Sequence, residues 1–143
     1  MLRVSARVDY ALRALVALAR EGSDPVKGDR LAREQAIPFR FLEVTLGELR
    51  HCGIVASRRG ADGGYWLARP PESITVADIL VALEGSLIDV RSVPLDEHES
   101  HDVHRVTRGV WSSAEADLDR LLGAITLADL AAQASAERDA VAG

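Results

Sequence analysis

The sequence has few cysteines and few aromatic residues. One cysteine, Cys52, occurs among 143 residues, so a single chain can form neither a disulfide framework nor a zinc or iron–sulfur site made of cysteines alone. Only 4% of the residues are aromatic although 48% are hydrophobic, so the core must consist largely of Ala, Leu and Val. This composition favours helices over a large sheet and is that of a globular protein. The length corresponds to about one domain.

Long apolar runs are also absent. The longest early run, at residues 14–19, is far shorter than the roughly 20 residues that span a bilayer. Charged side chains at Arg3, Arg7 and Asp9 interrupt the apolar segment that a signal peptide requires. The sequence therefore predicts a soluble, cytoplasmic protein with no membrane partner.

The charge is divided unevenly along the chain, whose formal net charge is −5. Residues 1–70 carry 12 Lys and Arg against 8 Asp and Glu, a balance of +4. Residues 71–143 carry 5 against 14, a balance of −9. A basic half can bind phosphate groups, whereas an acidic half cannot do so without cost. Because solvated surfaces often differ this much, the division alone does not identify a partner.

Three helices followed by a hairpin are predicted in the first half of the chain. Apolar residues at helical spacing predict helices over 5–21, 28–35 and 38–53, the last with Pro38 at its first helical position. Short strands are expected at 54–57 and 65–68, joined by turn-forming residues with two arginines. This order is typical of a winged helix-turn-helix, although a small helical domain with an ordinary hairpin would also fit it. In a winged helix the third helix lies in the major groove, and an Arg-rich hairpin tip suits the minor groove.

Pairs of capping residues predict where the later helices begin, and these pairs are Thr75 with Asp78, Ser112 with Glu115, and Thr126 with Asp129. The first of these helices is expected to end at Gly85, and the last is expected to be short. The segment 86–109 is polar. The fold class is therefore mainly α with a small β-hairpin.

Several segments together are specific for a known family, namely residues 37–43, 49–55, 59–70, 74–79 and 82–85. The most specific motif is Arg-Gly-x-x-Gly-Gly-Tyr at 59–65, followed by Leu-Glu-Gly at 83–85. The chain resembles the Rrf-type family of bacterial winged-helix transcriptional regulators, which includes IscR, NsrR and CymR. The resemblance covers nearly the whole chain. It implies a homodimer that binds a palindromic operator in double-stranded DNA, usually as a repressor.

The resemblance implies roles for individual residues of the winged helix. Arg40 and Glu43 match positions that present side chains to base edges, where arginine can contact guanine and glutamate can accept from cytosine. Arg59 matches the wing arginine that enters the minor groove. The expected phosphate contacts are Lys27, Arg50 and Arg58. Two alternatives remain open: Glu43 could pair with Arg40 or Arg50 on a solvated face, and the wing arginines could only protect the hairpin edge.

The resemblance also implies a long dimerisation helix in the C-terminal part. Its expected interface residues are Trp111, Leu118, Leu121, Leu122 and Ile125. The chain is accordingly divided into a winged helix-turn-helix at 1–85, a sensor-type loop at 86–109, and a dimerisation helix with a C-terminal tail at 110–143.

The expected sensor loop differs from that of relatives that hold an iron–sulfur cluster on three cysteines there. Since the loop contains no cysteine and iron is held by thiolates, a three-cysteine cluster is not expected. Three of the four histidines, His98, His101 and His104, lie there among four carboxylates. These ligands suit a divalent metal, and Asp9 is a further candidate ligand. A proton switch and a solvated loop without a ligand are the alternatives.

Two functions of different classes remain at this point. The first is a dimeric, sequence-specific DNA-binding repressor whose signal is a metal ion, a small molecule or a protein. The second is a winged-helix interaction module that regulates through a partner protein. An enzyme is not expected, because the sequence has no Gly-rich phosphate loop, no nucleophile elbow and no HExxH helix. Cys52 is expected to be a small buried residue.

Overall fold

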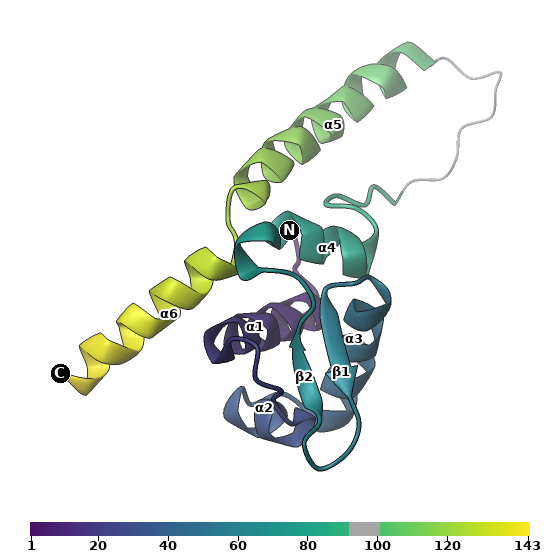
Figure 1. Cartoon of the computed structure of the whole chain (residues 1–143). Helices are drawn as coiled ribbons and strands as arrows, with labels where there is room; N and C mark the ends of the chain where they lie inside the picture. The colour runs from purple at the N-terminus through teal and green to yellow at the C-terminus, as the bar shows by residue number, and fades with distance from the viewer. Residues whose placement is uncertain (92–100) are drawn as a thin grey trace.

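The computed structural model describes residues 1–91 and 101–143. It confirms the predicted fold class, because helices and one two-stranded antiparallel sheet make up the described residues (Figure 1). The elements are α1 (Ala6–Glu21), α2 (Gly28–Glu34), α3 (Phe39–His51), β1 (Val55–Arg58), β2 (Gly64–Leu67), the short 3-10 helix η1 (Pro71–Ser73), α4 (Val76–Glu84), α5 (His101–Gly123) and α6 (Leu127–Ala142). Within these residues no helix is both long enough and apolar enough to cross a membrane.

Side-chain caps fix several helix starts. Ser5 accepts a hydrogen bond from the backbone N–H of Val8 and begins α1. The predicted capping box of Thr75 and Asp78 is present at α4 and satisfies two backbone N–H groups reciprocally. Gly85 ends α4 at φ 83°, a left-handed conformation that glycine adopts at little cost.

The predicted start of the long helix at Ser112 is wrong. Helix α5 begins at His101, and Ser112 lies exposed in its interior. Valines at 103, 106 and 110 continue the three–four spacing of a helix upstream of Ser112, so the chain has no reason to break there. Glu115 instead accepts hydrogen bonds from the backbone N–H groups of Leu87 (3.3 Å) and Ile88 (3.4 Å).

Further element boundaries also differ from the sequence prediction. Pro38 is the N-cap of α3, with φ −56° and ψ 124°, and the first helical residue is Phe39. Helix α6 has 16 residues and is not short, although its predicted capping box of Thr126 and Asp129 is present. Each strand is displaced by one residue from its predicted position, which is the usual scatter at element ends.

The hairpin is joined to the helices through Val26, which precedes α2. Its N–H donates to the Tyr65 carbonyl (2.9 Å) and its carbonyl accepts from the Tyr65 N–H (2.8 Å). At Gly64, on the same strand, a Cβ would lie 2.6 Å from the Val26 carbonyl oxygen, so this close approach requires glycine. The wing is therefore fixed against the helices and does not project as an isolated hairpin.

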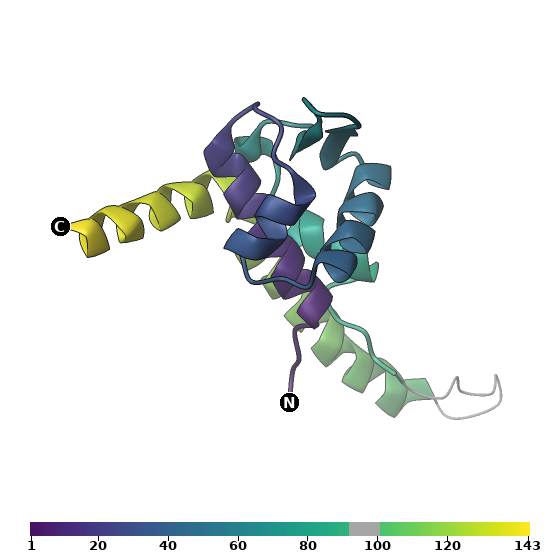
Figure 2. The ribbon, with the colours of Figure 1, turned by 90° about the horizontal axis from the view of Figure 1, so that it is seen from below.

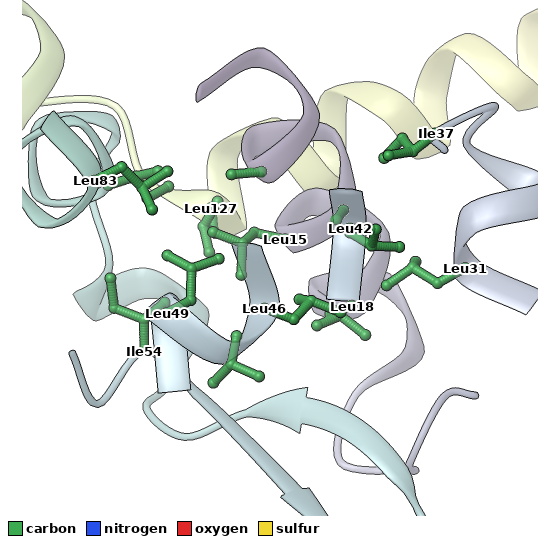
Figure 3. Close-up of a cluster of buried hydrophobic side chains, with 14 of the residues drawn as sticks. Leu15, Leu18, Leu31, Ile37, Leu42, Leu46, Leu49, Ile54, Leu83 and Leu127 are labelled. Atoms are coloured by element: carbon green, nitrogen blue, oxygen red, sulfur yellow. The ribbon is translucent and has the colours of Figure 1, made fainter. Parts of the chain in front are cut away.

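The core lies where α1, α3, α4 and the start of α6 meet (Figure 3). The predicted inward-facing residues of α2 and α3 are all buried, and these are Leu31, Ala32, Leu42, Leu46 and Leu49. Leu127, at the start of α6, is fully buried among them. Its N–H donates to the Ile74 carbonyl (2.9 Å), and the Val76 N–H donates to the Ile125 carbonyl (3.0 Å). The junction between α5 and α6 is thus attached to the start of α4, while both helices extend away from the body as arms (Figures 1 and 2).

Candidate nucleic-acid interface

Helix α3 is held along both of its flanks. On one flank, the Phe41 ring meets the Tyr10 ring edge-on at a centroid distance of 5.4 Å. On the same flank, Glu48 forms an ion pair with Arg7 at 3.0 Å. On the other flank, the Arg50 guanidinium donates to the Ser57 hydroxyl of β1 at 3.1 Å. The buried leucines of α3, Leu42, Leu46 and Leu49, set its rotation, and the face between the two flanks is the one presented to solvent.

The outward face of α3 contains the two predicted base-contacting residues, Arg40 and Glu43, and both are exposed. In the part of the chain that the structure describes, no ion pair joins Glu43 to Arg40 or to Arg50. The sequence analysis did not select two further exposed residues near this face, Val44 and His51. Their three–four spacing from Arg40 and Gly47 was the available signal.

The wing carries its cations next to α3, because β1 packs against that helix. Arg58, at the end of β1, donates to the Asp62 carbonyl at 3.0 Å, and Arg59 is exposed at the tip. Lys27 donates to the Gly60 carbonyl, so it holds the tip in addition to its predicted role as a phosphate contact. All of these cations belong to the basic half of the sequence, and they lie on or beside the winged helix.

Not every cation near α2 is free for a ligand. Arg30 pairs with Glu34 and with Glu21, each at 2.8 Å. The hydrogen bond to Glu34 and the charge of Glu21 raise the pKa of Arg30 above its ordinary value. Arg30 therefore remains charged, but its charge is balanced within the protein.

The predicted metal ligands are not brought together in the described residues. Asp9 pairs with Arg13 at 3.3 Å. His104 lies in the second turn of α5, whereas His98 and the side chain of His101 lie outside what the structure describes. Among the residues that it does describe, no group of three or more His, Cys, Asp or Glu could hold a metal ion. The metal site stays a prediction.

Cys52 is exposed, which corrects the expectation of a buried thiol. It is the C-cap residue of α3, where the chain turns from the helix toward β1. Its Sγ lies 3.8 Å from the Ala82 carbonyl oxygen. Its neighbours Leu49 and Ile54 are buried and fill the core at this point, so the thiol is not needed there.

The long helix α5 shows two different faces. Of the five predicted interface residues, Leu118, Leu122 and Ile125 are half-buried, and α5 packs against α4 of the same chain. Trp111 and Leu121 are exposed. Val103 and Val106, which the sequence analysis placed in a loop, are exposed, and so is Val110, so that the three valines are 58–72% exposed. Within residues 1–91 and 101–143, these valines and Leu121 form the apolar surface of α5 that is left exposed.

The sequence of the chain is similar to those of known proteins over nearly its whole length. A model of the Rrf2 family, described as an iron-dependent transcriptional regulator, matches residues 4–133. The Mycobacterium tuberculosis protein Rv1287 is 40% identical over 137 residues, which cover 95% of this chain and 85% of the relative. The HTH-type transcriptional regulator CymR of Bacillus subtilis is 30% identical over 140 residues, which cover 97% of this chain and 96% of CymR.

Solved structures of regulators from the same family are also similar to this chain over most of its length. The structure of B. subtilis CymR, described as the global cysteine regulator, superposes with a TM-score of 0.73 at 32% identity and covers 93% of this chain and 98% of CymR. The structure of T. potens IscR superposes with a TM-score of 0.74 at 37% identity and covers 93% of this chain and 88% of that one. The matching family is one of regulators and not of enzymes, which confirms the predicted class of function. With its sequence matched from residue 4 to residue 133 and its fold shared with CymR and IscR, this chain belongs to the Rrf2 family of transcriptional regulators.

Proposed function

We propose that the chain acts as a homodimeric repressor of transcription that binds a palindromic operator. In each half-site α3 enters the major groove and the wing enters the adjacent minor groove. The observation that carries this proposal is the outward face of α3. This face is exposed between the side of the helix that contacts α1 and the side that contacts β1, and it lies beside the cationic wing. Two such helices related by a two-fold axis would enter successive major grooves about 34–36 Å apart.

Individual roles follow from these positions. Arg40 and Glu43 contact base edges and supply sequence discrimination, each good contact contributing about 1–3 kcal/mol. Arg59 enters the minor groove, where negative potential attracts cations. The residues that fix the protein on the phosphate backbone are Lys27, Arg50 and Arg58.

Dimerisation through α5 is part of this proposal. The exposed valines and Leu121 of α5 form an apolar surface with no partner in the described part of the chain. Exposed apolar side chains that recur along one helix often mark an interface. A second copy of α5 would cover it, and the long helix would thereby join two winged helices. Residues 1–85 would then be the DNA-binding part, and the dimerisation part, predicted from the sequence at 110–143, would begin with α5 at His101.

Control of DNA binding by a divalent metal or by a protein partner is the next part of the proposal. The family model is described as iron-dependent, but the single cysteine of this chain cannot supply the thiolates of a three-cysteine cluster. A divalent metal held by His98, His101, His104 and Asp9 stays a prediction, as does control by a protein partner. Metal analysis of anaerobically purified protein, with DNA binding measured before and after chelation, distinguishes the two.

A DNA-binding titration tests the proposed function. The protein should bind duplex from the promoter region upstream of its own gene more tightly than a scrambled duplex, and its affinity should fall steeply as salt rises. Arg59→Ala should weaken binding and leave the melting temperature unchanged, because Arg59 is exposed. Arg138→Ala, which removes an exposed arginine from α6, is the matched control and should bind normally. Equal affinity for both duplexes would refute the proposal.

A further inference from the structure

The outward face of α3 presents one apolar side chain that the packing of the protein does not use. Val44 is 65% exposed in the middle of the helix. The leucines of α3 are buried, and Phe41 packs edge-on against Tyr10. The Phe39 ring packs against Gly28: a Cβ atom added to Gly28 would lie 3.3 Å from the ring. Among the described residues, Val44 is therefore the apolar residue of α3 whose side chain has no packing role inside the protein.

The position of Val44 places it among the residues proposed to face the bases. It follows Arg40 by four residues and precedes Gly47 by three, so the three lie on one face of the helix. At Gly47 nothing lies within 4 Å of where a Cβ would be. Gly47 therefore adds no side chain to the surface beside Val44, whose isopropyl group is open to contact from outside the protein.

The chemistry of this side chain limits what it can recognise. An isopropyl group neither donates nor accepts a hydrogen bond, so it cannot read the polar edges of guanine, adenine or cytosine. In the major groove, thymine presents its C5 methyl group, which is read by apolar contact. Contact between the two apolar groups removes both from water, and this makes the free energy of DNA binding more favourable.

We infer that Val44 reads the C5 methyl group of a thymine in each operator half-site. This inference rests on the proposed function, since it requires α3 to lie in the major groove. It adds a specificity-determining residue to Arg40 and Glu43 and states which base the operator must contain opposite the middle of α3. Loss of one methyl contact should weaken binding about fourfold, because burial of one such group contributes about 0.8 kcal/mol and tenfold corresponds to about 1.4 kcal/mol.

Removal of single methyl groups from the DNA tests the inference. An operator is first selected from random duplexes with the full chain. Each thymine of the half-site is then replaced by deoxyuridine, which lacks only the methyl group, in both half-sites at once. One of these replacements should weaken wild-type binding about 16-fold, which is the product of two fourfold losses. Val44→Ala should bind the thymine operator more weakly and should be insensitive to that same replacement.

The control is Val81→Ala, which makes the same change at an exposed valine on α4 and should keep the full methyl sensitivity. Because Val44 is exposed, Val44→Ala should fold, and a melting curve that matches the wild type verifies this. The inference is overturned if no deoxyuridine replacement weakens wild-type binding, or if Val44→Ala retains the wild-type sensitivity. If random duplexes yield no preferred sequence, the proposed function fails and the inference fails with it.

Discussion

Replacement of Gly47 by alanine should stabilise the protein while weakening its binding to DNA. Gly47 lies in the interior of α3, at a backbone conformation open to any residue. Alanine in place of glycine at such a position stabilises a helix by about 1 kcal/mol. The added methyl group meets no atom of the protein, since nothing lies within 4 Å of it. The melting temperature should therefore rise by about 4 °C for a domain of this size.

The effect on binding has the opposite sign. If the face of α3 lies against base edges, the new methyl group occupies space that the DNA fills in the complex. Overpacking of a close-fitting contact costs about 1–3 kcal/mol, so affinity for the selected operator should fall at least about fivefold. Stability and binding would thus change in opposite directions in one variant.

Differential scanning calorimetry and a fluorescence anisotropy titration on the operator measure the two effects. Gly109→Ala is the matched control: Gly109 also lies inside a helix, α5, with nothing within 4 Å of its missing side chain. It should give the same rise in melting temperature and unchanged DNA affinity. Undiminished operator binding by Gly47→Ala would show that this face of α3 does not contact DNA.

Two further variants test the C-terminal arms. Thr126→Ala removes the hydroxyl that accepts the Asp129 N–H at 3.1 Å and should cost about 1 kcal/mol of unfolding free energy, measured by urea denaturation; Thr107→Ala, in the interior of α5, should cost much less. Val106→Glu places a charge on the proposed dimer surface and should give monomers in sedimentation velocity, because a charge buried without a partner is expensive. Val141→Glu, on the exposed end of α6, should remain dimeric, and a dimeric Val106→Glu protein would rule out this surface.

Local signals in the sequence predicted the winged helix well. The leucines of α3 recur at helical spacing, and the Thr75–Asp78 and Thr126–Asp129 pairs form the hydrogen bonds that their spacing requires. Such features depend on residues a few positions apart, so the sequence contains all of their causes.

Features that depend on distant residues were not predictable in the same way. The pair Ser112 and Glu115 has the spacing of a cap, but Glu115 bonds instead to the backbone at Leu87 and Ile88, which no local pattern reveals. The exposure of Cys52 follows from how tightly Leu49 and Ile54 close the core.

The attachment of the α5–α6 junction to the start of α4 has a mechanical consequence. Backbone hydrogen bonds at Ile74 and Val76 hold the chain at Ile125 and Leu127, so α5 is anchored near one end. Its 23 residues extend about 34 Å from that point, at about 1.5 Å per residue. A tilt of about 5° around this pivot would displace the His101 end of α5 by about 3 Å. In the proposed dimer, such a tilt would change the spacing of the two α3 helices relative to successive major grooves.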